Sequence, residues 1–188
     1  MTSASISLTP AAPADYPAFK RELQAAFSEA VIAEYGALPN GPIPSDADLD
    51  QTMSAPNTVI LRIVRDKDHV GGCVLTIDAT SNENSLDLLF IKLGQHGAGI
   101  GRSAWHAIEA RYPQTRVWRT ITPYFEKRNI HFYVNRCGFK IVEFFNALHP
   151  DPHGMSANDF AGAEDLFRFE KIMTSERPAR KFRQRGNS

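Results

Sequence analysis

Three glycines at alternating positions mark the first stretch of the sequence that could do chemistry. Gly97, Gly99 and Gly101 stand between an apolar segment and a segment with helical spacing. Because glycine has no Cβ atom, the backbone N–H groups in this loop are open to a ligand. The first turn of the following helix adds unpaired N–H groups and the positive end of the helix dipole. This combination predicts a binding site for a phosphate group.

Two other phosphate-binding motifs fit this stretch less well. A P-loop needs glycine at position 96 and lysine at position 102, where the chain has His96 and Arg102. The dinucleotide-binding pattern G-x-G-x-x-A fits residues 99–104, but it also needs an acidic residue about 20 residues later to hold a ribose. Between Ala110 and Phe125 there is no Asp or Glu. A nucleotide-dependent oxidoreductase is therefore disfavoured.

A tyrosine and an asparagine further along the chain are candidates for a cofactor groove. Tyr133 follows Asn129 by four residues, which places both on one face of a helix predicted over 126–137. A residue at the boundary of the core is the simpler interpretation of Tyr133, because tyrosine has an apolar ring and a polar end. The buried stripe of the same helix is predicted to be apolar: Ile130, Val134 and Cys137.

An acidic residue, Asp87, lies in an apolar strand predicted over 85–93. Alternation of side chains along a strand places it on the same face as Leu89 and Ile91. A carboxylate there could accept a proton or bind a cation. A hydrogen-bonded carboxylate at the edge of a sheet is the structural alternative. Weaker candidates for the same role lie near a later strand: Glu143 and His149.

These side chains must be positioned by a mixed α/β fold. Hydrophobic spacing and turn residues predict the order β, α, α, β, β, β, α, β, α, β, β. The predicted strands cover 6–9, 58–65, 70–79, 85–93, 115–122, 139–145 and 166–173, and the predicted helices cover 15–35, 45–53, 100–112 and 126–137. This order indicates one sheet, partly antiparallel and partly parallel. The strand over 85–93 is apolar on both faces toward its end, which predicts a central place in the sheet.

The composition is ordinary for a soluble globular protein. Of the 188 residues, 21 are basic and 21 are acidic, so bulk charge does not indicate nucleic-acid or membrane binding. We find no signal-peptide pattern and no apolar run near the roughly 20 residues of a membrane helix. Cys73 and Cys137 lie outside metal-ligand spacings, and we expect no metal and no disulfide framework. We expect a cytoplasmic protein with one domain over 1–175 and a basic, flexible tail over 176–188.

Two stretches together resemble the GNAT acetyltransferase superfamily. The family pattern Q/R-x-x-G-x-G/A falls on residues 96–101 after the apolar Leu89–Ile91, and it departs from the family at His96. A second family motif has an Asn, a Tyr on the same helix and then Gly-Phe, and it resembles residues 129–139. Small residues are common in the family at the position of Phe132. The resemblance covers most of residues 6–173 and implies a GNAT-like fold.

The resemblance implies an N-acetyltransferase that uses acetyl-CoA and passes the acetyl group directly to a primary amine. It implies that the strand over 85–93 splays from the strand over 115–122, and that the pantetheine arm lies between them. Backbone groups of Ile91 and Leu93 would bond this arm. Tyr133 would be the general acid near the sulfur, and Asp87 stands on the strand where some members carry a general base. The remaining cofactor-binding positions would be His96, Gly97, Ala98, Gly99, Ile100, Gly101, Arg102 and Asn129.

A non-catalytic acyl-CoA sensor is the second hypothesis, and the presence of Tyr133 and Asp87 disfavours it. The acceptor, a small molecule or a peptide, is expected to contact the segments 36–57 and 146–163. We expect neither nucleic acid nor a membrane as a partner, and we leave open whether the protein is a homodimer. Within the first segment, three carboxylates could attract a cationic amine or serve as ordinary surface caps: Asp46, Asp48 and Asp50.

Overall fold

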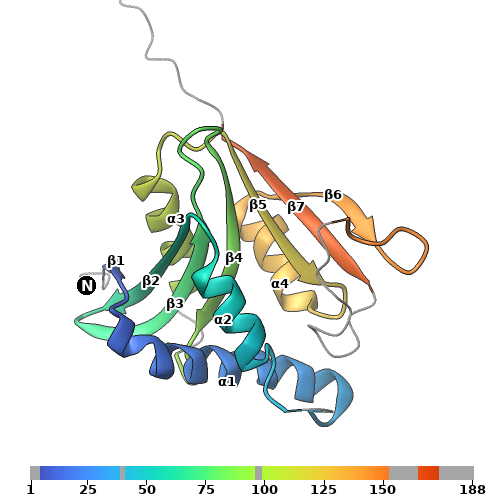
Figure 1. Cartoon of the computed structure of the whole chain (residues 1–188), viewed down its shortest axis with the longest axis horizontal. Helices are drawn as coiled ribbons and strands as arrows, with labels where there is room; N and C mark the ends of the chain where they lie inside the picture. Colours follow the sequence, from blue (N-terminus) through green and yellow to red (C-terminus); the bar gives the residue numbers. More distant parts are fainter. Residues whose placement is uncertain (1–4, 39–40, 96–98, 153–164, 174–188) are drawn as a thin grey trace, which may run out of the picture.

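The computed structural model describes residues 5–38, 41–95, 99–152 and 165–173. Within them, seven strands form one mixed sheet in the order β1-β2-β3-β4-β5-β7-β6 (Figure 1). The strands are β1 (Ile6–Pro10), β2 (Thr58–Arg65), β3 (Asp68–Thr76), β4 (Glu83–Ile91), β5 (Val117–Pro123), β6 (Lys140–Phe145) and β7 (Leu166–Ile172). β4 and β5 pair in parallel, and the other neighbouring strands pair in antiparallel fashion. The predicted mixed α/β class and the central place of β4 are confirmed.

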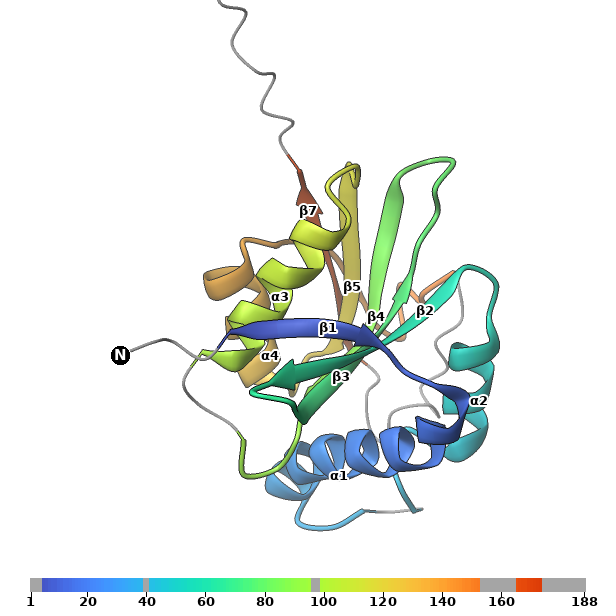
Figure 2. The ribbon, with the colours of Figure 1, turned by 90° about the vertical axis from the view of Figure 1, so that its left-hand side faces the viewer.

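Helices cover both faces of this sheet (Figure 2). After a short 3-10 turn (Pro13–Asp15), α1 (Tyr16–Tyr35) and α2 (Asp46–Ser54) pack on one face, and α3 (Ile100–Arg111) and α4 (Lys127–His131) lie on the other. Among the residues that the structure describes, no helix has the length and apolar character needed to cross a membrane. The predicted tail over 176–188 lies outside the described residues.

α4 continues into a π-helical segment, Phe132–Cys137, where the sequence predicted one regular α-helix over 126–137. The wider turn is closed by the Gly138 N–H, which donates to the carbonyl of Tyr133 five residues earlier. Gly138 has a φ of +79° and ends the segment, as glycine does after many helices. The prediction of a helix that ends at Gly138 is confirmed. The prediction that this helix is a regular α-helix throughout is wrong.

Local signals explain where α2 and α3 begin. The Ser45 Oγ accepts from the Asp48 N–H at 3.2 Å, and the Ser45 N–H donates to the Asp48 carboxylate at 3.2 Å. This is the predicted capping box, and it starts α2. α3 starts after Gly99, whose φ of +72° lies in the left-handed region that favours glycine.

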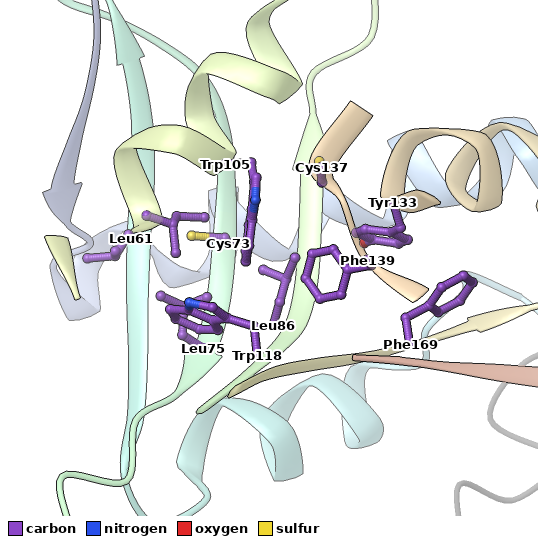
Figure 3. Packing of buried hydrophobic residues seen from close by; sticks show 11 residues of the cluster. Leu61, Cys73, Leu75, Leu86, Trp105, Trp118, Tyr133, Cys137, Phe139 and Phe169 are labelled. Atoms are coloured by element: carbon purple, nitrogen blue, oxygen red, sulfur yellow. The ribbon is translucent and has the colours of Figure 1, made fainter. Parts of the chain in front are cut away.

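Aromatic side chains fill the core between α3, the π-helical segment and the sheet (Figure 3). The buried rings of Trp105 and Trp118 meet edge to face with centroids 5.4 Å apart, and Trp105 also lies 5.0 Å from Phe139. Tyr133 extends the cluster, with its ring 5.6 Å from those of Phe139 and Phe169. Edge-to-face packing of this kind has a defined geometry, so the cluster fixes the position of Tyr133 against the sheet.

β4 and β5 separate soon after they begin, as expected. Their parallel pairing covers Glu83–Ser85 against Val117–Arg119. Beyond these residues β4 stays paired with β3 up to Ile91, and β5 stays paired with β7 up to Pro123. Figure 1 shows the two strands diverging toward their carboxyl ends. The backbone groups that face the opening are therefore available to a ligand.

Gly72 on β3 allows α1 to lie close to the sheet. A Cβ atom at this position would lie 2.3 Å from Cε2 of Phe19 on α1 and 2.8 Å from Cε1 of Phe90 on β4. We expect Gly72→Ala to lower the free energy of unfolding by about 1–3 kcal/mol, because both buried rings must shift. Urea unfolding followed by circular dichroism measures this change. An unfolding midpoint equal to that of the wild type would contradict the close packing of α1.

Candidate active site

Two adjacent cavities lie where β4 and β5 diverge. The first has a volume of about 720 Å³ and is lined by α1, α2, β4 and β5; we call it the α2 cavity. The second has a volume of about 1100 Å³ and is lined by α1, the end of β4, the start of α3, and α4; we call it the α3 cavity. The residues that line both cavities are Phe27, Leu89, Phe125, Glu126, Asn129 and Tyr133. These shared residues mark the junction of the two cavities.

The α3 cavity has the features of an anion-binding site at one end. The first turn of α3 contributes Gly99, Ile100, Gly101 and Arg102 to its wall. Unpaired N–H groups and the positive end of the helix dipole favour an anion at that turn. Basic side chains from α3, α4 and the π-helical segment line the same cavity: Arg102, Lys127, Arg128, His131 and Arg136. The cavity is therefore suited to phosphate groups.

Gly101 contributes to the close approach of α3 to the π-helical segment. A Cβ atom at Gly101 would lie 3.3 Å from Cε2 of Phe132. Phe132, which stands where the family commonly has a small residue, is therefore accommodated because Gly101 on α3 has no side chain. Both residues line the α3 cavity, so this contact shapes its wall.

Most of the predicted cofactor-binding residues that the structure describes lie at the α3 cavity. Ile91 and Asn129 line it together with the first turn of α3. Leu93 lies beyond the end of β4, its side chain is 47% exposed, and it is not among the described lining residues. The predicted positions His96, Gly97 and Ala98 lie outside the described residues. The basic side chains on α4 were missed, although the four-residue spacing of Lys127 and His131 could have indicated a common face.

A β-bulge in β4 sets the direction of the Asp87 side chain. In the pairing with β3, Leu88 lies opposite Val74, and the next paired residue, Leu86, lies opposite Leu75. Asp87 is therefore the extra residue of the bulge. A bulge of one residue shifts the alternation of side chains along the strand by one position.

Asp87 consequently faces the other side of the sheet from the one predicted. Its carboxylate accepts hydrogen bonds from the Thr76 Oγ1 at 2.7 Å and the Ser85 Oγ at 2.5 Å. Thr76 and Ser85 are paired across the two strands and share one face, whereas Leu89 packs in the cluster under α3. The prediction that Asp87 shares the face of Leu89 and Ile91 is therefore wrong, because the bulge breaks the alternation. The side chain lines the α2 cavity.

The environment of Asp87 disfavours its charged form relative to that of an exposed aspartate. Burial raises the pKa of Asp87 above its ordinary value, and the hydrogen bonds from Ser85 and Thr76 only partly offset this rise. A carboxyl group with a raised pKa is better matched to proton transfer near neutral pH than an exposed one. The surroundings of Asp87 are therefore compatible with the predicted role of a general base.

Tyr133 and Asn129, which their spacing predicted to share one helix face, both lie at the junction of the two cavities. Tyr133 is 7% exposed, and burial raises its pKa well above the ordinary value for tyrosine. A side-chain hydrogen bond with Thr120 lowers the pKa, and the charge of Glu126 raises it further. The phenol therefore keeps its proton near neutral pH, which a general acid requires. Tyr133 is also part of the aromatic core. It therefore has the packing role that the sequence suggested for a residue at the boundary of the core, and it lines the cavities as well.

Glu126 also lies at the junction, and the sequence did not single it out. It is the residue before α4, and burial raises its pKa while the charge of Arg128 lowers it. Its position follows from the turn between β5 and α4, which no spacing rule predicts. The available signal was its place three residues before Asn129, close to one helical turn.

The two arginines that line the α2 cavity are held in ion pairs, whereas several of its described carboxylates are not. Arg119 donates to Glu170 and Glu83, each at 2.8 Å, and Arg168 pairs with Glu143. In the part of the chain that the structure describes, three lining carboxylates have no cationic ion-pair partner: Asp48, Asp87 and Glu126. An electronegative cavity of this kind favours a cationic ligand.

Apart from Asp48, the remaining candidates from the sequence lie outside both cavities. Glu143 is 2.9 Å from the His149 Nε2 and is also paired with Arg168, and neither Glu143 nor His149 is among the lining residues. Asp46 accepts from the Gln24 side chain at 2.9 Å, and Asp50 pairs with Lys20. Of the three aspartates considered for the acceptor, Asp48 lines the α2 cavity.

The raised pKa of Asp87 predicts a pH dependence of stability. Between the ordinary and the raised pKa, the folded protein binds more protons than the unfolded chain, so its stability falls as the pH rises. Asp87→Asn removes this titration. We therefore expect the stability of the variant, relative to the wild type, to improve as the pH rises through this window.

Asp78 provides the matched control, because hydrogen bonds from Ser81 and Thr80 lower its pKa. Its contribution to stability is present above its ordinary pKa and is lost as the pH falls, so Asp78→Asn should lose stability relative to the wild type as the pH rises. Urea unfolding of the three proteins between about pH 2.5 and pH 7 covers the window below the ordinary aspartate pKa for Asp78 and the window above it for Asp87, and so tests both signs. The same pH trend in both variants would contradict the difference between the two sites.

Comparisons with known proteins bear on the fold and the family of the chain. No protein-family model matches the chain. The uncharacterized protein YrkN of Bacillus subtilis (strain 168) is 50% identical over 165 residues, which are 85% of this chain and 89% of YrkN. An acetyltransferase from Thermus thermophilus superposes with a TM-score of 0.64 at 18% identity, covering 92% of this chain and 100% of that protein.

A second solved structure is a GNAT family acetyltransferase from Elizabethkingia anophelis with acetyl-CoA bound. It superposes with a TM-score of 0.61 at 14% identity and covers 90% of this chain and 99% of its own. The superpositions confirm the fold that the glycine loop and the Asn129–Phe139 segment suggested. The chain therefore belongs to one protein family with YrkN, and its fold is that of the GNAT N-acetyltransferase superfamily.

Proposed function

We propose that this protein transfers the acetyl group of acetyl-CoA directly to a primary amine. The observation that carries the proposal is the junction between two cavities at the opening between β4 and β5, one with basic side chains beside the first turn of α3 and the other with carboxylates outside the described ion pairs. One cavity is suited to phosphate groups and the other to a cation. An N-acetyltransferase needs both properties, because it must hold a phosphorylated acyl donor and an amine close to each other.

The α3 cavity would hold the coenzyme A portion. The first turn of α3, from Gly99 to Arg102, would bind the pyrophosphate through its N–H groups, and Arg102 and Arg136 would add charge. The pantetheine arm would lie along Leu89–Ile91, where β4 has left β5 and its backbone groups can bond the amides of the arm. The acetyl-CoA bound by the Elizabethkingia anophelis protein of the same fold supports this assignment.

The transfer itself would take place at the junction. The amine nitrogen bonds to the thioester carbon, and a backbone N–H near Ile91 faces the carbonyl oxygen as negative charge develops on it. The carbon–sulfur bond then breaks, and Tyr133 gives its proton to the sulfur. Asp87, in the α2 cavity, binds the ammonium group or takes its proton before the attack. The proton lost by the amide nitrogen returns Tyr133 to its phenol form.

The anion site predicts a charge-dependent affinity for coenzyme A. We expect Arg102→Ala to weaken binding about tenfold, because one charged contact to a phosphate group is lost. Isothermal titration calorimetry with acetyl-CoA measures this change. Arg116→Ala is the matched control, since Arg116 is exposed just before β5 and is not among the lining residues of the α3 cavity. Equal affinities of the two variants would argue against a phosphate at the start of α3.

Tyr133→Phe tests the general acid. We expect turnover to fall about 100-fold, because the leaving sulfur loses its proton donor, while acetyl-CoA binding stays near that of the wild type. A thiol-release assay with acetyl-CoA and grouped primary amines measures turnover. Tyr112→Phe, at the end of α3, is the control for the loss of a hydroxyl group away from the junction. If Tyr133→Phe turns over as fast as the wild type, Tyr133 is not the acid.

A further inference from the structure

Glu126 stands out among the acidic residues around the two cavities. Among the residues that the structure describes, it is the one carboxylate that lines both cavities. Asp87 lines the α2 cavity, and Glu34 lines the α3 cavity. If the acetyl group is presented at the junction, the group that takes the proton of the attacking amine must also reach the junction. Glu126 meets this condition together with Tyr133 and Asn129.

The side chain of Glu126 is not used to stabilise its own helix. Glu126 precedes α4, where a side-chain oxygen commonly accepts from the first N–H groups, yet it makes no such capping hydrogen bond. Its backbone takes part in the turn, because its N–H donates to the Pro123 carbonyl at 3.1 Å and its own carbonyl accepts from Ile130 at 3.0 Å. The backbone therefore holds the residue in place, and the carboxylate is left to the cavities.

Glu126 and Asp87 differ in the hydrogen bonds that their carboxylates accept. Both oxygens of Asp87 accept from hydroxyl groups, Thr76 on one and Ser85 on the other, which fixes its orientation and stabilises the anion. Within the described residues, no hydrogen-bond donor to the Glu126 carboxylate is found, and Arg128 acts on it as a neighbouring charge. The Asp87 carboxylate is therefore oriented to hold a cation in place, whereas the Glu126 carboxylate is not held by hydrogen bonds of this kind from the described residues.

We propose that Glu126 is the general base that takes the proton from the acceptor's ammonium group, while Asp87 positions that group. This inference rests on the proposed acetyl transfer. The N–H bond of the ammonium breaks, the proton passes to a Glu126 oxygen, and the freed lone pair of the nitrogen bonds to the thioester carbon. Tyr133 protonates the departing sulfur and recovers a proton from the new amide nitrogen. Glu126 then releases its proton to solvent, which balances the reaction.

The test compares Glu126→Gln with the wild type in a thiol-release assay with acetyl-CoA. The acceptor is the most active amine of a fixed panel: n-pentylamine, 1,5-diaminopentane, 6-aminohexanoate and a short peptide with a free amino terminus. We expect Glu126→Gln to lower kcat about 100-fold, because the base is lost while the shape is kept, and to leave the KM for acetyl-CoA within about twofold. Asp68→Asn, at the exposed start of β3, is the control for the loss of a carboxylate away from the site.

A second variant separates a catalytic role from a structural one. Glu126→Ala leaves space for a small carboxylate, so added formate should restore part of its turnover, whereas chloride at the same ionic strength should not. Two results would overturn the inference and leave the proposed function intact. One is a Glu126→Gln protein as active as the wild type, and the other is a Glu126→Ala protein that formate does not rescue. A wild-type protein that binds acetyl-CoA and releases no thiol with any amine of the panel would overturn the proposed function and, with it, the base.

Discussion

The separation of β4 from β5 is the constraint on which the rest of the structure depends. Pairing ends at Ser85 and Arg119, and each strand then keeps a partner on its outer side alone. Backbone groups left open inside a sheet need another partner, because an unpaired buried N–H or C=O group costs about 1–3 kcal/mol. The bulge at Asp87 lies two residues beyond Ser85, the last residue of β4 that pairs with β5. One irregularity thus turns a carboxylate toward the α2 cavity at the place where the strands part.

The helices convert this opening into two connected sites. The aromatic cluster of Trp105, Trp118 and Phe139 holds α3 and the π-helical segment against the sheet, and Tyr133 belongs to that cluster while it also lines both cavities. A reactive group supported by fixed aromatic neighbours keeps its orientation without a mobile loop. Burial keeps Tyr133 protonated, and the charge of Glu126 acts in the same direction on its pKa. The aromatic core and the candidate site therefore share Tyr133, so the packing of the core sets the geometry of the site.

The sequence predicted the features that depend on local chemistry. The capping box at Ser45, the glycine at the end of the π-helical segment and the order of the strands follow from residue types at fixed spacing. The bulge at Asp87 could not be predicted, because strict alternation is the default for an apolar strand and the extra residue is seen in the pairing with β3. Glu126 was missed for a similar reason, since its place at the junction depends on the turn after β5.

The most direct test of the central claim is a crystal structure of the protein with acetyl-CoA bound. The proposal predicts the pyrophosphate at the first turn of α3, between Gly99 and Arg102, and the pantetheine arm in the opening beyond Ser85. It predicts the sulfur at the junction of the cavities, beside Tyr133 and Glu126. An acetyl-CoA molecule bound away from the opening between β4 and β5, or one whose sulfur points away from Tyr133, would contradict the proposed function.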